Sequence, residues 1–245
     1  MDYEWIMDLH THTLASGHAY CTMQEMWKAA SEKGLKILGI TEHAPQMPGS
    51  CGSLYFTNFR VVPRQRYGVE LWLGAELNIM DYDGNVDLKP RDLKDLDVVI
   101  ASLHLPCIRP GTEAENTRAL LKVMENPYVD IIGHPDDSRY PVNYEALVEG
   151  AKKYGKVLEL NNTSLNPRGF RVGTRENDIC MLNYCREYQV PILVNSDAHM
   201  DVTVGEFSYA VSLLEELAFP EELVLNRSRE AVYPYLNICR RQREE

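Results

Sequence analysis

The sequence contains no uninterrupted apolar run of about 18 residues, the shortest stretch that is typical of a transmembrane helix. Its first residues also lack a basic segment followed by an apolar one, which is the pattern of a secretory signal. These two absences argue against a membrane-spanning or secreted protein. We therefore expect a cytoplasmic protein without a membrane partner.

Basic residues are also scarce. The chain has 25 Lys and Arg against 36 Asp and Glu, which gives a formal net charge of −11. This balance lacks the basic footprint of a nucleic-acid-binding protein, so we expect no nucleic-acid partner. The six cysteines form no Cys-x-x-Cys pair, which favours a reduced protein in which they are small core residues.

What the sequence does contain is a regular alternation of strands and helices over 245 residues. Short apolar segments typical of buried strands are separated by helical segments with capping residues, and this order predicts a parallel sheet. Seven such units, without the glycine pattern of a dinucleotide-binding fold, favour a (β/α)7 variant of the TIM barrel, with a single domain spanning 1–245. The expected strands are 5–7, 35–41, 71–75, 97–103, 129–133, 156–160 and 190–195.

All seven histidines lie just after an expected strand or in the loop that follows it. Two carboxylates share this placement, because Glu76 follows the third strand and Asp197 follows the seventh. In a barrel these positions meet at the C-terminal rim of the strands, where active sites of this architecture lie. Imidazole and carboxylate are zinc ligands, so the sequence predicts a metal cluster at the rim. The candidate ligands are His10, His12, His18, His43, Glu76, His104, His134, Asp197 and His199.

Nine ligands are too many for one ion, because a catalytic zinc takes about three protein ligands. They suit two or three ions, with a carboxylate bridging a pair. Such a pair holds a hydroxide that is deprotonated near neutral pH and attacks an electrophile. Since the charge of the ions exceeds that of the two carboxylates, we expect an anionic substrate such as a phosphate ester.

The candidate ligands lie in short motifs that resemble those of the PHP (polymerase and histidinol phosphatase) superfamily. The likeness is closest to its YcdX-like phosphatase subgroup and covers nearly the whole chain. The motifs are Asp8-Leu9-His10-Thr11-His12, Thr41-Glu42-His43, Gly74-Ala75-Glu76, Ser102-Leu103-His104, Gly133-His134-Pro135 and Ser196-Asp197-Ala198-His199.

The resemblance implies a distorted (β/α)7 barrel with a trinuclear site, with zinc as the first choice and Mn2+ or Fe2+ as alternatives. The implied ligand sets are His10, His12, Glu76 and Asp197 for the first ion, Glu76, His104 and His134 for the second, and His18, His43 and His199 for the third. One residue departs from the subgroup, because Glu42 precedes His43 where Asp is typical. We expect Glu42 to support a ligand rather than to bind metal. Asp8 shares the strand face of His10 and has either a similar supporting role or a structural one.

These implications predict a metal-dependent phosphatase that hydrolyses the phosphomonoester of a small metabolite through a metal-bridging hydroxide. Glu76 and Asp197 are the expected catalytic residues, the first as the bridging ligand. The leaving alkoxide takes its proton from water or from a site carboxylate, and Asp197 is the favoured carboxylate. A histidinol phosphatase of histidine biosynthesis and a polymerase-associated exonuclease share the motifs, and the net charge of −11 disfavours the exonuclease. A non-catalytic metal-binding regulatory module is the alternative from another class. The sequence is compatible with a homo-oligomer.

Residues 44–68 follow His43 without clear periodicity, and we expect a long functional loop at the rim. Its arginines, Arg60 first, are candidates for binding substrate phosphate, because a guanidinium group matches phosphate oxygens with two hydrogen bonds. Solvated loop charges are the alternative interpretation of these arginines. The aromatic residues Tyr55, Phe56 and Phe59 would cover a bound substrate.

Overall fold

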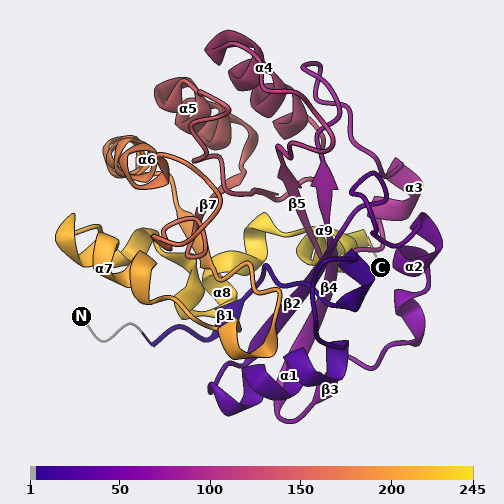
Figure 1. Ribbon diagram of the computed structural model, residues 1–245. Coiled ribbons are helices and arrows are strands. Elements are labelled where there is room, and N and C mark those ends of the chain that lie inside the picture. Colours follow the sequence, from indigo (N-terminus) through magenta and orange to yellow (C-terminus); the bar gives the residue numbers. More distant parts are fainter. Residues whose placement is uncertain (1–3, 245) are drawn as a thin grey trace.

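Figure 1 shows a barrel of strands surrounded by helices. The computed structural model describes residues 4–244. The main strands pair in parallel in the order β1-β2-β4-β5-β6-β7-β8, and the short β3 pairs antiparallel with β4. This is a distorted (β/α)7 barrel, so the predicted fold is confirmed. The strands are β1 Met7–Asp8, β2 Ile37–His43, β3 Gln65–Arg66, β4 Val69–Asn78, β5 Val98–Ser102, β6 Ile131–Ile132, β7 Val157–Asn161 and β8 Ile192–Asn195.

The seam between β8 and β1 is bridged in part by the side chain of Asn226. At the rim, a parallel bridge joins Thr11 to Ala198. Deeper in the seam, the Asn226 amide donates to the carbonyl oxygens of Met7 and Val194 at 3.2 and 2.6 Å. The same amide accepts a hydrogen bond from Val194 N–H at 2.8 Å. Because it satisfies backbone groups of both strands, Asn226 seals the gap between them.

Most helices lie outside the strands (Figure 1). Four of those in the described chain, α1, α4, α5 and α8, begin after a residue whose side chain caps the helix. Thr22 and Thr112 each form a capping box with the glutamate three residues later, as their spacing predicts. Within residues 4–244, no helix is long and apolar enough to cross a membrane. The α-helices are α1 Met23–Glu32, α2 Ser53–Thr57, α3 Pro90–Leu93, α4 Glu113–Met124, α5 Tyr144–Tyr154, α6 Thr174–Tyr188, α7 Ser208–Glu216, α8 Arg229–Val232 and α9 Asn237–Glu244. The 3₁₀ segments are η1 Leu14–Ser16, η2 Phe59–Val61, η3 Asp201–Thr203, η4 Glu221–Leu223, η5 Leu225–Arg227 and η6 Tyr233–Tyr235.

Two apolar layers hold the barrel together. The outer layer lies between the sheet and the helices, and the inner layer fills the barrel around Trp72 and Ile100. Val232 of α8 and Ile238 of α9 belong to the inner layer, and Ile238 N–H donates to the carbonyl of Asp97, just before β5. The C-terminal segment therefore closes the bottom of the barrel, and polar groups gather at the opposite end.

Gly74 of β4 shows how closely β4 and β5 approach each other. A Cβ atom at this position would lie 1.9 Å from the carbonyl oxygen of Val98. We expect Gly74→Ala to lower the free energy of unfolding by about 3 kcal/mol, because such overpacking forces the backbone to move. The urea midpoint measures the loss. Gly52→Ala is the matched control, since a Cβ at Gly52 meets nothing within 4 Å. Equal stability of the two variants would contradict this close packing.

Residues 44–68 differ from the expected loop because they contain α2, η2 and β3. Phe56 and Phe59 are only 2% and 4% exposed and belong to the outer apolar layer. The Tyr55 ring packs edge-on against Phe59, with 5.1 Å between the ring centroids. These aromatic residues were expected to cover a substrate, and they instead anchor the segment to the core.

Candidate metal centre

The nine candidate ligands, which we call the ligand cluster, meet at the C-terminal end of the barrel. His10 and His12 follow β1, His43 is the last residue of β2, and Glu76 lies within β4. His104 and His134 each lie two residues beyond a strand, and so does Asp197 after β8. Parallel strands bring their carboxyl ends to one rim, which explains why residues so distant in the sequence meet. His18 and His199 complete the cluster from the loops after β1 and β8.

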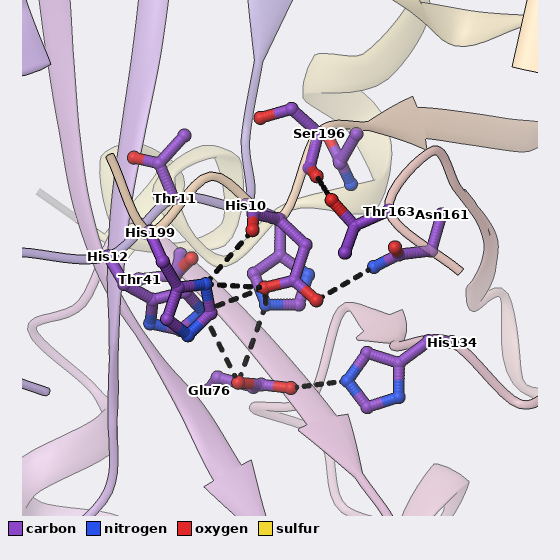
Figure 2. A network of polar contacts seen from close by, with 12 residues as sticks. His10, Thr11, His12, Thr41, Glu76, His134, Asn161, Thr163, Ser196 and His199 are labelled. Carbon is purple, nitrogen blue, oxygen red and sulfur yellow. Dashed lines mark hydrogen bonds and ion pairs between the residues drawn. The ribbon is translucent and has the colours of Figure 1, made fainter. Parts of the chain in front are cut away.

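Glu76 lies at the centre of the ligand cluster and is fully buried (Figure 2). Its Oε1 atom lies 2.8 Å from His134 Nε2 and 3.1 Å from His104 Nε2. Its Oε2 atom faces three other rings, at 2.7, 3.4 and 3.5 Å from His43 Nδ1, His10 Nε2 and His12 Nε2. The two oxygens of one carboxylate therefore face two different sets of histidine nitrogens.

Asp197 is the second carboxylate of the ligand cluster. Its Oδ1 atom lies 3.2 Å from His12 Nε2 and 3.6 Å from His10 Nε2. Asp197 and His134 have positive φ angles of 54° and 27°, a backbone region that L-residues rarely adopt. Strained backbone is retained where the surroundings hold a side chain in a required position, and functional sites are where such strain collects.

His18 and His199 form the outer part of the ligand cluster. The His18 ring centroid lies 4.8 Å from that of His43 and 4.9 Å from that of His199. The rings of His12 and His43 stack with 4.2 Å between centroids. His18 is exposed and His199 is partly exposed, whereas the inner members are buried.

Several buried atoms of the ligand cluster make no hydrogen bond within the described chain. They are His10 Nε2, His12 Nε2, His43 Nδ1, Glu76 Oε2 and His104 Nε2. Leaving buried polar atoms without partners is costly, so their convergence indicates a ligand that binds them. Nitrogen and carboxylate oxygen suit zinc, and also manganese or iron, so these residues fit divalent metal ions. Groups whose ligand atoms lie within 4.8 Å of one another are His10-His12-Glu76, His10-His134-Asp197, His43-Glu76-His104 and His12-His43-His199.

The rings are oriented by residues to which the sequence analysis gave no role. His10 Nδ1 lies 2.7 Å from Glu159 Oε1, and His104 Nδ1 lies 2.7 Å from Asn78 Oδ1. The other Glu159 oxygen accepts a hydrogen bond from His134 N–H at 2.8 Å. Such contacts fix which nitrogen is free to bind metal, and losing them typically costs 10- to 100-fold in affinity or activity.

Glu42 lies behind the ligand cluster, as the sequence analysis expected. It accepts hydrogen bonds from Thr13 N–H at 3.0 Å, Ser16 Oγ–H at 2.6 Å and Tyr55 Oη–H at 3.3 Å. Ser16 Oγ in turn lies 3.1 Å from His12 Nδ1. Glu42 therefore acts on the His12 ring through Ser16.

Asp8 ties β1 to the loop that carries Asp197. It accepts hydrogen bonds from Ser196 N–H at 3.1 Å and Gly205 N–H at 2.9 Å. Burial raises the pKa of Asp8 to about 6, and these hydrogen bonds oppose that shift. Of the two roles left open for Asp8, these contacts favour the structural one.

The pKa values of both carboxylates of the ligand cluster are shifted downward, which favours their ionised forms. Burial raises the pKa of Glu76, but the rings of His104 and His43 outweigh burial and hold it well below its usual range. Burial opposes ionisation of Asp197 as well, and His10 outweighs it, so that the Asp197 pKa is also well below its usual value. Both groups are therefore in the state that a metal ligand needs.

The pKa values of two histidines of the ligand cluster, His10 and His12, are shifted in opposite directions. Burial lowers the pKa of His10, yet Glu159 and Glu76 reverse this and raise it well above its usual value. For His12, burial and the neighbouring His43 both act downward and lower the pKa well below its usual value. His12 therefore presents a neutral ring, whereas a metal ion that binds His10 displaces a proton.

The sequence as a whole was compared with known protein families. A family model described as the PHP domain matches residues 8–166, from β1 past the end of β7. The chain belongs to the PHP domain family. The matched part contains seven of the nine candidate ligands, and Asp197 and His199 lie beyond it.

Curated relatives of this PHP domain chain are named probable phosphatases. One from Clostridium novyi (strain NT) is 46% identical over 233 residues, which are 95% of each chain. Another, from Caldanaerobacter subterraneus subsp. tengcongensis, is 45% identical over 99% of this chain and 95% of its own. The name agrees with the activity that the motifs predict.

Solved structures similar to this PHP domain chain include two histidinol phosphatases. The enzyme from Lactococcus lactis, described as complexed with zinc, L-histidinol and phosphate, matches with a TM-score of 0.59 and 17% identity over 87% of this chain and 94% of its own. A putative histidinol phosphatase from Listeria monocytogenes matches with a TM-score of 0.54 and 17% identity over 82% of this chain and 98% of its own. At this level of identity, the likeness supports the shared fold alone.

A cavity of about 710 Å³ opens directly on the ligand cluster of the PHP domain. Its wall includes His18, His199 and Asp197, together with Arg139 and Arg171. Arg171 Nη2 lies 3.0 Å from Asp197 Oδ2, and only 7% of the Arg171 side chain is exposed. A buried guanidinium thus lies beside the ligand cluster and faces the cavity.

Arg60 is not among the residues that line this cavity. It lies in η2 and is exposed, because the neighbouring Phe56 and Phe59 anchor this segment to the outer layer. Arg171 follows β7 and occupies the place in which the sequence analysis expected Arg60. The signal that was missed is an arginine in the loop after a barrel strand, the same placement that identified the histidines.

Proposed function

We propose that this PHP family chain is a metal-dependent phosphatase that hydrolyses the phosphomonoester of a small metabolite. The observation that carries the proposal is Glu76, whose two oxygens face two different sets of histidine nitrogens. A carboxylate in that position is suited to bridge two ions. The probable phosphatases that are 45–46% identical over nearly the whole chain support the same activity.

Three divalent ions, with zinc as the first choice, would account for all nine candidate ligands. The distances support a first site around Glu76 Oε2 and Asp197 Oδ1 and a second around Glu76 Oε1. The ring contacts of His18 support a third, outer site. This arrangement is that of the YcdX-like subgroup, to which we assign the chain. The proposed ligands are His10, His12, Glu76 and Asp197 for the first ion, Glu76, His104 and His134 for the second, and His18, His43 and His199 for the third.

Bound divalent ions supply a Lewis acid and a water that deprotonates near neutral pH, which is the chemistry that phosphate ester hydrolysis requires. The protein places Arg171 beside them, where its guanidinium can donate to the phosphate oxygens. Asp197 holds Arg171 through Oδ2 and keeps Oδ1 for metal.

We propose a role for Asp197 other than that of proton donor, namely to bind metal and to hold Arg171. Against the effect of burial, His10 holds the pKa of Asp197 well below its usual range, which disfavours a carboxyl proton that could pass to the leaving alkoxide. We propose that solvent water in the open cavity supplies this proton. The candidate ligands extend from His10 to His199 and the barrel needs β1 to β8, so we further propose that 1–245 acts as one phosphoesterase domain.

Metal removal tests the proposed function. We expect about three divalent ions per chain by elemental analysis, since each ion takes three or four of the protein ligands. Release of phosphate from a simple phosphomonoester should fall to background after chelation and return when zinc is added. Circular dichroism of the stripped protein checks that the fold persists.

Two results would contradict this proposal. One ion or fewer in protein that was never exposed to chelator would exclude the trinuclear site. Full metal content without hydrolysis of any phosphomonoester would instead support the non-catalytic metal-binding module.

A further inference from the structure

We infer that the alcohol part of the substrate is apolar, either aromatic or compact and aliphatic, and that it carries a single phosphate. This inference rests on the proposed phosphatase function and concerns the part of the cavity beyond the ligand cluster. Its basis is the composition of the cavity mouth, the fixed position of Phe170 and the pairing of the charges around it.

The mouth of the cavity gathers apolar side chains from separate loops. Of the eleven large hydrophobic residues that are exposed in the described chain, four line this cavity. They follow β1, β5, β7 and β8, so the barrel rather than the local sequence brings them together. An exposed apolar cluster in a concave wall is typical of a ligand site. The four residues are Tyr20, Leu105, Phe170 and Met200, which are 73%, 45%, 68% and 47% exposed.

Phe170 is held in place although its ring is largely exposed. The Arg171 guanidinium carbon lies 5.0 Å from the ring centroid, and that of Arg139 lies 5.8 Å from it. Both distances allow cation–π contacts. Since both arginines are themselves fixed by ion pairs with Asp197 and Asp137, the apolar wall is formed before a substrate binds.

Once Arg171 is assigned to the substrate phosphate, Arg139 is the remaining basic side chain that the described cavity wall offers to a second anionic group, and it is already paired with Asp137. Arg139 Nε lies 2.9 and 3.0 Å from the two Asp137 oxygens, so its charge is neutralised at the mouth. Among the described residues, the arginines that line the cavity are Arg139 and Arg171, and no lysine lines it. A second phosphate or a carboxylate on the substrate would therefore lie near the negative charge of Asp137, and no unpaired basic side chain of the described wall would offset the repulsion.

Two hydroxyl groups in the cavity wall already donate hydrogen bonds to backbone carbonyls. Thr163 Oγ1 donates to the carbonyl of Ser196 at 2.7 Å, and Thr203 Oγ1 donates to the carbonyl of Met200 at 2.9 Å. Each hydroxyl has one proton, so neither can donate to a sugar hydroxyl without breaking its bond. These two hydroxyls are therefore poorly placed to recognise a polyol.

Steady-state kinetics on three substrates tests the inference with the full, metal-loaded chain. Benzyl phosphate and glycerol phosphate both release alkoxides, but the first carries an apolar ring where the second carries two hydroxyl groups, and fructose bisphosphate adds a second phosphate. We expect kcat/KM for benzyl phosphate to exceed the other two by at least about tenfold, the effect of burying a ring of this size.

Variants of Phe170 locate the effect. Phe170→Ala should lower kcat/KM for benzyl phosphate by about tenfold and that for glycerol phosphate by less than about twofold. Phe170→Leu keeps an apolar wall and should retain most of the preference. Leu54→Ala is the matched control and should change neither value, because Leu54 is 79% exposed and lines a different groove.

The outcomes separate this inference from the phosphatase proposal. Preference for glycerol phosphate or fructose bisphosphate would overturn the inference and leave the phosphatase proposal in place. Equal losses on benzyl and glycerol phosphate in Phe170→Ala would also overturn it, because the ring would then support the site in general. Hydrolysis of none of the three would overturn the phosphatase proposal and this inference with it.

Discussion

Glu76→Gln is expected to lower kcat/KM for phosphate release by more than about 100-fold. Removing a residue that only supports a metal ligand typically lowers metal affinity or activity 10- to 100-fold. We expect a larger loss for Glu76, because it faces the histidine nitrogens directly. An amide carries no charge. Its nitrogen can neither accept a hydrogen bond from the second set of histidines nor bind the metal ion that they would hold. The substitution therefore removes the carboxylate that we propose to join two ions, at nearly unchanged side-chain volume.

The metal content of Glu76→Gln shows how the loss arises. We expect elemental analysis to give fewer ions than in the unchanged protein, because two of the three proposed ions share Glu76. Circular dichroism and the melting temperature should stay close to those of the unchanged protein after both are stripped of metal.

Glu70→Gln is the matched control for Glu76→Gln. Glu70 lies at the other end of β4, where it accepts from Trp72 Nε1 at 2.9 Å and from Arg229 Nη1 at 2.6 Å. We expect this variant to keep its activity per folded molecule. If Glu76→Gln kept near-normal turnover with full metal content, Glu76 would not be the bridging ligand.

The barrel and the ligand cluster could be predicted because both are encoded locally. Each strand is a short apolar segment, and the ligands follow at its end, as in the run from Asp97 through Ser102 to His104. A barrel places every such end at one rim, so a histidine after a strand has a predictable position. The placement of Glu76 and His134 required only the strand pattern, with no knowledge of contacts between strands.

The supporting residues could not be predicted because they depend on pairing across the barrel. Glu159 reaches His10 over 149 residues of sequence, and Asn226 reaches Met7 over 219. Nothing in the local sequence of a buried glutamate or asparagine indicates which distant group it will meet. Such contacts follow from strand order and register, which the structure supplies.

The role of the loops was harder still to predict. The segment with Arg60 and its aromatics had the composition of a substrate loop, but burial of Phe56 in the outer layer decided its course. The loop after β7 carries Arg171 to the cavity, with Gly173 at a φ of 65° just before α6. Which loop reaches the cavity depends on packing energy that is shared over many residues. The composition of a loop alone does not predict its course.

Arg171→Ala is expected to lower kcat/KM by about 100- to 1,000-fold, the usual cost of removing one donor from the charge that develops in a transition state. Arg171 is the buried guanidinium of the cavity wall, and it donates to Ser164 Oγ at 2.9 Å as well as to Asp197. The loss should appear with both benzyl phosphate and glycerol phosphate, because both present the same phosphate. Phosphate release at saturating metal measures it.

Arg60→Ala is the matched control, since Arg60 is exposed and does not line the cavity. We expect less than about a twofold change in kcat/KM, the size of effect typical of a solvated surface charge. A tenfold or larger loss in this variant would restore Arg60 as a phosphate-binding residue.

Metal content and Arg171→Lys separate the two ways in which Arg171 can act. If the guanidinium binds phosphate, Arg171→Ala should keep its ions, and Arg171→Lys should recover part of the activity, because a lysine supplies the charge without the two-pronged geometry. If Arg171 acts only by holding Asp197, the alanine variant should lose metal, and excess zinc should restore its activity. Asp197 Oδ2 would then keep its hydrogen bond from Asn161 Nδ2, which is 3.2 Å away. Full metal content with an unchanged kcat/KM would exclude both roles.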